Sequence, residues 1–250
     1  MMRTITLFTL IALLPAPGFA AGGGVKLMHA DVDLGDKESL QRGAATFVNY
    51  CMGCHSASYM RYNRIGKDLG ISDDVLESNF IFNPEDKVGD TMEIAMRKSD
   101  AENIYFAVNP PDLSVIARSR GADWLYTYFM TFYKDESRPM GVNNLVFKDV
   151  GMPHVLWQKQ GMQAPVYEMV RTADGGEKKV ITGLEQISRG SQSTEEYQQT
   201  VRDLVNFLVY LGEPAQLKRK TVGFWVLFYL IVLLLPVVYL LKKEYWRDIH

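Results

Sequence analysis

Two cysteines and a histidine stand in the pattern C-x-x-C-H, at Cys51, Cys54 and His55. On one helical turn, thiols at this spacing reach the vinyl groups on one edge of a porphyrin, and the adjacent imidazole reaches the iron. The chain has only these two cysteines, so a four-ligand zinc site is disfavoured. A thioredoxin-like dithiol would need a βαβ context, and a structural disulfide would leave the histidine unexplained. The motif therefore predicts one covalent haem c and an electron carrier.

The second axial ligand of the iron distinguishes an electron carrier from a gas-binding or peroxidatic haem. Downstream of the motif, the candidates are His154, Met140, Met152 and Met162. Met152 stands in Gly-Met-Pro and Met162 in Gly-Met-Gln-Ala-Pro, where glycine permits close approach to a porphyrin and proline stiffens the chain beyond it. The residues alone do not separate these two methionines.

A secretory signal peptide is predicted at residues 1–20. Arg3 supplies its positive charge, residues 5–14 its apolar core, and residues 18–20 a small-x-small cleavage site. Covalent haem attachment takes place on the export side of a membrane, so the signal and the C-x-x-C-H motif support each other. We therefore expect residues 21–217 to form a periplasmic c-type haem domain.

A second apolar run, residues 222–241, contains 20 residues without a charge and would span about 30 Å of hydrocarbon as a helix. Basic residues flank it on both sides, so its orientation follows from the signal peptide and not from flanking charge. We expect a transmembrane anchor at residues 218–243 and a cytoplasmic tail at residues 244–250. This places the chain in the inner membrane of a bacterium, with a single span and the haem domain on the periplasmic side.

The predicted haem domain is acidic. The whole chain has 27 basic and 29 acidic residues, and without the seven basic and two acidic residues outside positions 21–217 the domain keeps 20 and 27, a net charge of −7. The acidic residues cluster at positions 73–77, 85–90 and 100–102. Such a surface repels nucleic acid and attracts cationic proteins in a salt-dependent way, although solubility alone would also explain it. We expect no nucleic-acid partner.

The pattern of apolar residues predicts a mainly α-helical fold. Residues 37–50 have one apolar helical face, and Ser193 with Glu196 forms a capping box before a second helix that Gly212 and Pro214 end. Between them, the sequence predicts a turn at 109–114, helices over 116–120 and 123–133, and a small β-hairpin over 166–181. The fold class is a c-type cytochrome fold with insertions and a small β-hairpin, preceded by an extended arm over 21–36 and followed by one C-terminal transmembrane helix.

These motifs together resemble the cytochrome c1 family, the haem subunits of ubiquinol–cytochrome c oxidoreductase (bc1) complexes. The resemblance covers nearly all of residues 41–245. Its most specific segments are C-M-G-C-H-S at 51–56 followed by M-R-Y at 60–62, N-P-P-D-L-S at 109–114, A-R-S-R at 117–120, G-M-Q-A-P at 161–165 and G-E-P at 212–214.

The resemblance implies roles for further residues. The methionine of the family's G-M-x-x-P segment is the sixth iron ligand, which favours Met162, with Met152 next. Pro110 and Pro111 match prolines that line the haem. Arg120 matches an arginine that contacts a propionate, as a guanidinium can do with two parallel hydrogen bonds.

The resemblance also implies partners and a function. The chain would accept electrons from a Rieske iron–sulfur protein and pass them to a soluble cytochrome c. It would be the electron-transfer subunit of ubiquinol–cytochrome c reductase, with no bond-making chemistry of its own, and its anchor would pack against a cytochrome b subunit. The alternatives are a membrane-tethered or oxidase-linked cytochrome c outside a bc1 complex, and a haem sensor or peroxidase with a vacant sixth position.

Overall fold

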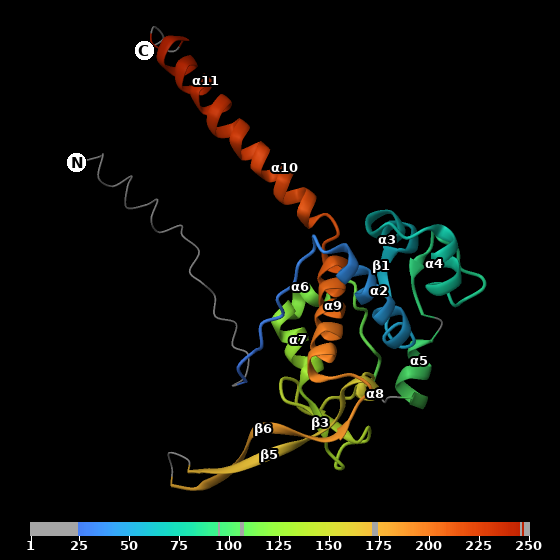
Figure 1. Ribbon diagram of the computed structural model, residues 1–250. Helices are drawn as coiled ribbons and strands as arrows, with labels where there is room; N and C mark the ends of the chain where they lie inside the picture. Colours follow the sequence, from blue (N-terminus) through green and yellow to red (C-terminus); the bar gives the residue numbers. More distant parts are fainter. Residues whose placement is uncertain (1–24, 95, 106–107, 172–174, 246, 248–250) are drawn as a thin grey trace.

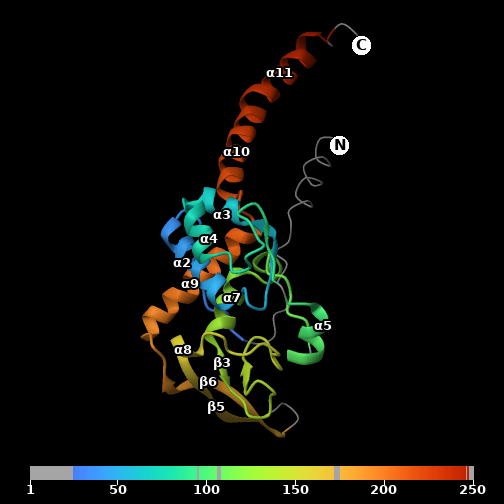
Figure 2. The same ribbon diagram turned by 90° about the vertical axis from the view of Figure 1, so that its right-hand side faces the viewer.

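A computed structural model describes residues 25–94, 96–105, 108–171, 175–245 and 247. The predicted signal peptide lies outside these residues. A helical domain carries two projections, a long β-hairpin at one end and the C-terminal helix at the other (Figure 1). The view turned by 90° shows the same separation (Figure 2). The mainly α-helical fold with β-hairpins and one long apolar helix is confirmed.

Two helices cross at the centre of the domain, α2 (Lys37–Tyr50) and α9 (Thr194–Gly212), and both match the predicted positions. The predicted capping box at the start of α9 is present. Gly43 makes the crossing possible, because a Cβ there would lie 2.0 Å from the backbone oxygen of Asp203. Phe47 and Phe207 pack beside this contact with ring centroids 5.6 Å apart.

Short elements connect the two central helices and surround them. Three two-stranded antiparallel sheets, β1–β2, β3–β4 and β5–β6, are present among the described residues. The elements between α2 and the long hairpin are β1 (Ala57–Arg61), α3 (Tyr62–Leu69), α4 (Asp73–Asn79), β2 (Thr91–Met92), α5 (Lys98–Asp100), η1 (Ala101–Tyr105), α6 (Ile116–Arg120), α7 (Ala122–Met130), β3 (Phe132–Lys134), β4 (Val142–Asn144) and α8 (Trp157–Gln160).

One helix is shorter than the sequence predicts. We expected a helix over residues 123–133, whereas α7 ends at Met130 and the chain turns into β3. Phe132 pairs with Asn144 in an antiparallel register. The aromatic residues after Met130 fit a strand as well as a helix, and antiparallel pairing with β4 decides between the two.

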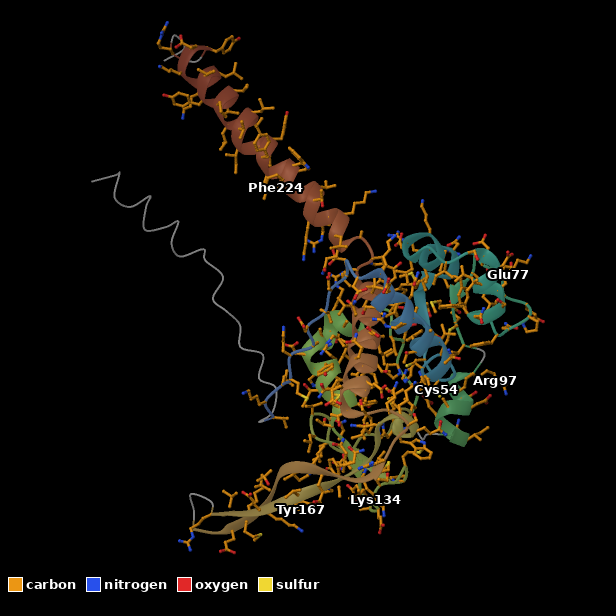
Figure 3. The ribbon with its side chains drawn as sticks, in the orientation of Figure 1. Cys54, Glu77, Arg97, Lys134, Tyr167 and Phe224 are labelled. Atoms are coloured by element: carbon orange, nitrogen blue, oxygen red, sulfur yellow. The ribbon has the colours of Figure 1, made fainter. Side chains whose placement is uncertain are left out.

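The hairpin is longer than predicted. Strand β5 (Gly161–Arg171) pairs with β6 (Glu177–Arg189) over its whole length, from Gly161 opposite Arg189 to Arg171 opposite Glu177. It therefore starts five residues before the predicted residue 166 and includes Met162. Figure 3 shows Tyr167 on this hairpin, well away from Cys54.

The C-terminal helix runs from Gln216 to Tyr245 and leaves the domain entirely. It consists of α10 (Gln216–Tyr229), η2 (Leu230–Leu234), α11 (Leu235–Leu240) and η3 (Leu241–Tyr245). With 30 residues and an apolar central stretch, it is long and apolar enough to cross a membrane, and none of that apolar stretch is buried. Figure 3 shows Phe224 on this helix, far from the domain. The helix contains the whole predicted span.

The described part of the predicted extended arm, residues 25–36, lies along α7 and α9. The backbone N–H of Ala30 donates to Asp123 Oδ1 at 2.8 Å, and that of Met28 donates to Thr127 Oγ1 at 2.8 Å. Asn206 Nδ2 in α9 donates to the backbone oxygen of Asp33 at 2.7 Å. These hydrogen bonds fix a segment that has no helix or strand of its own.

Candidate functional site

A cavity of about 260 Å³ lies beside the crossing of the central helices, lined almost entirely by apolar side chains. It is bounded by the turn after α2, by α6 and α7, by Leu208 of α9, and by the loop that follows β4. Six of the seven predicted site residues line it, namely Cys51, Cys54, His55, Pro110, Pro111 and Arg120. The structure thus brings together segments that are up to 69 positions apart, from Cys51 to Arg120.

The C-x-x-C-H motif forms a turn directly after α2. The backbone N–H groups of Cys54 and His55 both donate to the carbonyl of Cys51, at 3.0 and 2.9 Å. Both cysteines are free thiols. Burial raises the pKa of Cys51 to about 12 and also raises the pKa of Cys54, so both sulfurs are protonated at neutral pH. Two thiols and an imidazole are therefore presented to one cavity from a single turn.

The ring of His55 is held in one orientation. Its Nδ1 lies 2.7 Å from the backbone oxygen of Pro111, and because a carbonyl only accepts hydrogen bonds, Nδ1 carries the proton. The lone pair of Nε2 is then available to a metal, as in metal-binding histidines whose other nitrogen is hydrogen-bonded. Burial lowers the pKa of His55, although the bond to Pro111 partly opposes this, so the neutral imidazole is favoured.

Asp112 holds the Pro110–Pro111 turn against the haem motif, a role that the sequence analysis missed. Its Oδ2 accepts hydrogen bonds from the N–H and the hydroxyl of Ser58, at 2.9 and 2.8 Å, and its Oδ1 accepts from the N–H of Ser114 at 2.8 Å. Burial by itself would raise the pKa of Asp112, but the bonds from Ser114 and Ser58 lower it overall. The Asx-type turn in D-L-S was the signal that could have identified this residue.

The two candidate methionines occupy different places. Met152 lines the cavity with Gly151 and Pro153. Met162 does not: it lies in β5 opposite Ser188, and its N–H donates to Ser188 Oγ at 2.9 Å. The resemblance favoured Met162, but the structure does not bring this residue to the cavity. Pairing between β5 and β6 places its segment in the hairpin instead.

The other two candidates for a sixth ligand also lie outside the cavity lining. His154 is buried and stacks on Phe132, with ring centroids 4.8 Å apart and planes at 3°. Burial lowers the pKa of His154 to about 4. Met140 is partly buried and packs against the hydrophobic core. These two side chains have packing roles in the structure.

A pair of asparagines shapes the loop that carries Met152. Asn144 Oδ1 accepts from the N–H groups of Val146 and Phe147, at 3.0 and 3.3 Å, and its Nδ2 donates to the backbone oxygen of Tyr128 at 2.7 Å. Asn143 Oδ1 accepts from the N–H of Asp149 at 2.9 Å. Sequence reasoning passed over this Asn-Asn pair, and both side chains are almost completely buried.

Arg120 lies at the edge of the cavity. Its guanidinium carbon is 5.1 Å from the ring centroid of Trp124 and 5.8 Å from that of Phe147. In the part of the chain that the structure describes, no carboxylate forms an ion pair with Arg120. A cation stacked on aromatic rings and without a partner carboxylate suits the carboxylate of a propionate group.

Two of the three predicted acidic clusters lie on α4 and the loop after it, and the third, at positions 100–102, lies on α5 and η1. Asp73 and Asp74 form the first turn of α4, and Glu77 projects from the same helix (Figure 3). Glu85 is exposed in the following loop, and Asp86 is partly exposed. Helix α4 and the loop after it thus carry acidic side chains at the surface.

The site's donor set fits a covalently attached haem: two free thiols, an imidazole with one free nitrogen, a thioether and an unpaired guanidinium face one apolar cavity. Comparisons with known proteins agree with this. A family model described as the cytochrome C1 family matches residues 30–249.

Curated relatives cover the whole chain. Cytochrome c1 of Allochromatium vinosum is 48% identical over 249 residues, and a protein of Nitrosomonas europaea named ammonia monooxygenase gamma subunit is 51% identical over 251 residues, each with 100% of both chains covered. Cytochrome c1 of Rhodospirillum rubrum is 26% identical over 243 residues, covering 86% of this chain and 83% of that one.

Proposed function

The chain belongs to the cytochrome c1 family, and on that premise we propose that it carries single electrons from a Rieske iron–sulfur protein to a soluble cytochrome c. Members of the family carry one covalent haem c, which supplies one-electron redox chemistry at its iron. The chain is then the electron-transfer subunit of a quinol–cytochrome c reductase, and no bond is made on it. The observation that carries the proposal is the single cavity that gathers Cys51, Cys54, His55 and Met152.

The four residues have separate roles in this proposal. Cys51 and Cys54 would hold the porphyrin covalently, each through a thioether bond from its sulfur. His55 presents Nε2 to the iron, and its bond to Pro111 keeps the imidazole neutral and oriented. Met152 would offer its thioether sulfur to the iron and replaces Met162 as the candidate sixth ligand.

Three further residues complete the proposed haem pocket. Pro110 and Pro111 contribute apolar walls without N–H groups that would need partners. Arg120 binds a propionate, and Trp124 and Phe147 hold its guanidinium in place. The apolar lining keeps water from the iron, which favours electron transfer over reactions at an open coordination site.

The chain is membrane-anchored through its C-terminal helix. We place residues 1–20 as the signal peptide, 21–217 as the periplasmic haem domain, 218–243 as the anchor and 244–250 as the cytoplasmic tail, in a bacterial inner membrane. The fully exposed apolar helix supports this arrangement, because such a surface needs lipid or another membrane helix around it. A cytochrome b subunit is the proposed neighbour in the membrane.

The acidic surface on α4 and the loop after it is the proposed docking site for cytochrome c. Opposite charge raises the encounter rate of partners at low ionic strength. Reversing the charges of Asp73, Asp74, Glu85 and Asp86 should flatten the salt dependence of cytochrome c reduction. An unchanged salt dependence would remove this part of the proposal.

Purification of the tagged full-length chain from membranes tests the function directly. We expect haem that stays with the acid-denatured polypeptide, and co-purification of a multi-span b-type cytochrome and an iron–sulfur protein. Quinol should reduce the haem in this assembly, and removal of the iron–sulfur protein should stop the reduction. A chain that holds no covalent haem, or whose haem is reduced equally well without the iron–sulfur protein, would contradict the proposal.

A second candidate function rests on the Nitrosomonas europaea relative, which is 51% identical over its full length and is named as a subunit of ammonia monooxygenase. In that case the same haem domain would serve a different membrane oxidoreductase, as a tethered cytochrome outside a bc1 complex. The identity of the co-purified subunits separates the two candidates, because only the reductase contains a b-type cytochrome with an iron–sulfur partner.

A further inference from the structure

We propose that Tyr128 is a positioning residue for the axial thioether: its hydroxyl donates a hydrogen bond to Met152 and lowers the electron donation of the sulfur to the haem iron. The inference deepens the proposed function and rests on its assignment of Met152 as a ligand. Sequence analysis did not single out Tyr128, which stands as one of several aromatic residues in α7.

The contact is specific to these two side chains. Tyr128 Oη lies 3.4 Å from Met152 Sδ, within the range of a hydrogen bond to sulfur. Both residues line the cavity, and only 8% of Tyr128 is exposed. Among the described residues, Met152 is the hydrogen-bond partner of this hydroxyl. A buried hydroxyl normally has a partner, so the bond to sulfur satisfies a group that burial would otherwise leave unpaired.

The ring of Tyr128 is held on several sides, which fixes the hydroxyl. Trp124 stacks on it at 5.1 Å and 13°, and Phe129 and Phe132 meet it edge-on at 5.5 and 5.0 Å. The backbone oxygen of Tyr128 accepts from Asn144, the same side chain that holds the N–H groups of the loop leading to Met152. The side-chain amide of Asn144 therefore helps to position both the donor, Tyr128, and the loop that carries the acceptor, Met152.

The chemical consequence follows from the two lone pairs of a thioether sulfur. One can bind a metal while the other accepts the phenolic hydrogen, and accepting that hydrogen withdraws electron density from the sulfur. The oxidised iron carries more positive charge and depends more on electron donation from the sulfur. Weakening this donation therefore destabilises the oxidised form more than the reduced form. The Tyr128 hydroxyl therefore shifts the redox equilibrium toward the reduced form.

Tyr128→Phe in the full-length, haem-loaded chain tests the inference, because phenylalanine keeps the ring contacts and removes only the hydroxyl. We expect a lower reduction potential in equilibrium titration. At the wild-type midpoint, the ratio of oxidised to reduced protein should rise roughly fivefold, the equivalent of one ordinary hydrogen bond. The sulfur-to-iron charge-transfer band of the oxidised protein should shift but persist, and the reduced protein should still not bind carbon monoxide.

Tyr126→Phe is the matched control. Tyr126 is in the same helix and only 6% exposed, but its hydroxyl bonds with Arg202 and the residue does not line the cavity. This variant should lose comparable stability with an unchanged potential and charge-transfer band. The inference fails if Tyr128→Phe leaves both readouts unchanged, or if Tyr126→Phe moves them equally.

Met152→Leu separates this failure from a failure of the ligand assignment. If Met152→Leu abolishes the charge-transfer band while Tyr128→Phe has no effect, Met152 is the ligand and only the role of Tyr128 is wrong. If Met152→Leu keeps the band, the assignment on which the inference rests is itself wrong.

Discussion

Residues 151–153 and residues 161–165 begin with the same Gly-Met pair, ten positions apart, and end in proline, yet the structure uses them differently. The first forms part of the cavity wall and presents Met152 to it. The second opens β5, where pairing with β6 directs the chain into the projecting hairpin. Local sequence made both methionines candidates, and contacts with distant residues distinguish them.

The difference shows that a methionine can reach the cavity only if its backbone is held next to it. The loop with Met152 is held by Asn143 and Asn144, whose side chains take the place of a backbone ladder. The segment with Met162 satisfies its backbone through β6 and has no freedom to approach the cavity. Strand character at residues 166–170 was visible in the sequence, and extending it back to Gly161 would have removed Met162 from the loops.

The largest expected effect comes from exchanging the methionines for leucine one at a time. Met152→Leu keeps the volume but removes the thioether, so the oxidised protein should lose its sulfur-to-iron charge-transfer band and the reduced protein should bind carbon monoxide. Met162→Leu should leave both spectra as in the wild type. Absorption spectra of the two variants decide the matter, and the reverse pattern would restore Met162 as the ligand.

Alanine substitutions at Gly161 and Gly151 should change the stability of the fold without changing the ligand of the iron. Gly161 has φ +83°, and a Cβ there would lie 2.1 Å from the backbone oxygen of Ser188. Gly161→Ala should therefore lower the free energy of unfolding by on the order of 3 kcal/mol, measured in denaturant, while the charge-transfer band persists.

Gly151→Ala is the comparison for that variant. Gly151 has no positive φ, and its nearest neighbour would be Val108 Cγ2 at 3.3 Å, which a small shift can relieve. We expect a loss below about 1 kcal/mol. Equal losses for the two alanine variants would show that the strand register at Gly161 is less restrictive than the structure indicates.

Asn144→Ala should have an intermediate effect that reaches the iron. It leaves the N–H groups of Val146 and Phe147 without their acceptor, and it should lower the free energy of unfolding by about 2 kcal/mol. Because the loop carries Met152, the reduced variant should also bind carbon monoxide, which the reduced wild type should not. Stopped-flow mixing detects this binding, and its absence would show that Asn144 does not position the ligand.

Gln163→Ala, the corresponding amide change in the second segment, should have a small effect on stability and none at the iron. Gln163 Nε2 donates to the backbone oxygens of Met130 and Phe132, but Gln160 also donates to that of Met130. We expect a loss of about 1 kcal/mol and no change in carbon monoxide binding. Carbon monoxide binding in this variant would indicate that the hairpin base also controls access to the iron.

Much of the fold followed from local patterns. Helix α2 and the capping box at Ser193 were predicted at their observed positions, because a helix face and its cap are determined by residues within a few turns. Hydropathy predicted the C-terminal helix for the same reason. The errors lie where pairing between two strands decides the structure: the end of α7 at Met130 and the length of the β5–β6 hairpin.

The sequence by itself determined which chemical groups this protein can offer. Cys51, Cys54 and His55 lie within five consecutive residues, so their side chains stay near one another in any fold. Only the tertiary structure decided that Met152 lines the same cavity, that Pro111 orients His55 and that Tyr128 bonds the thioether. Those relations join residues far apart in the chain, and they depend on strand register and packing, which no local pattern specifies.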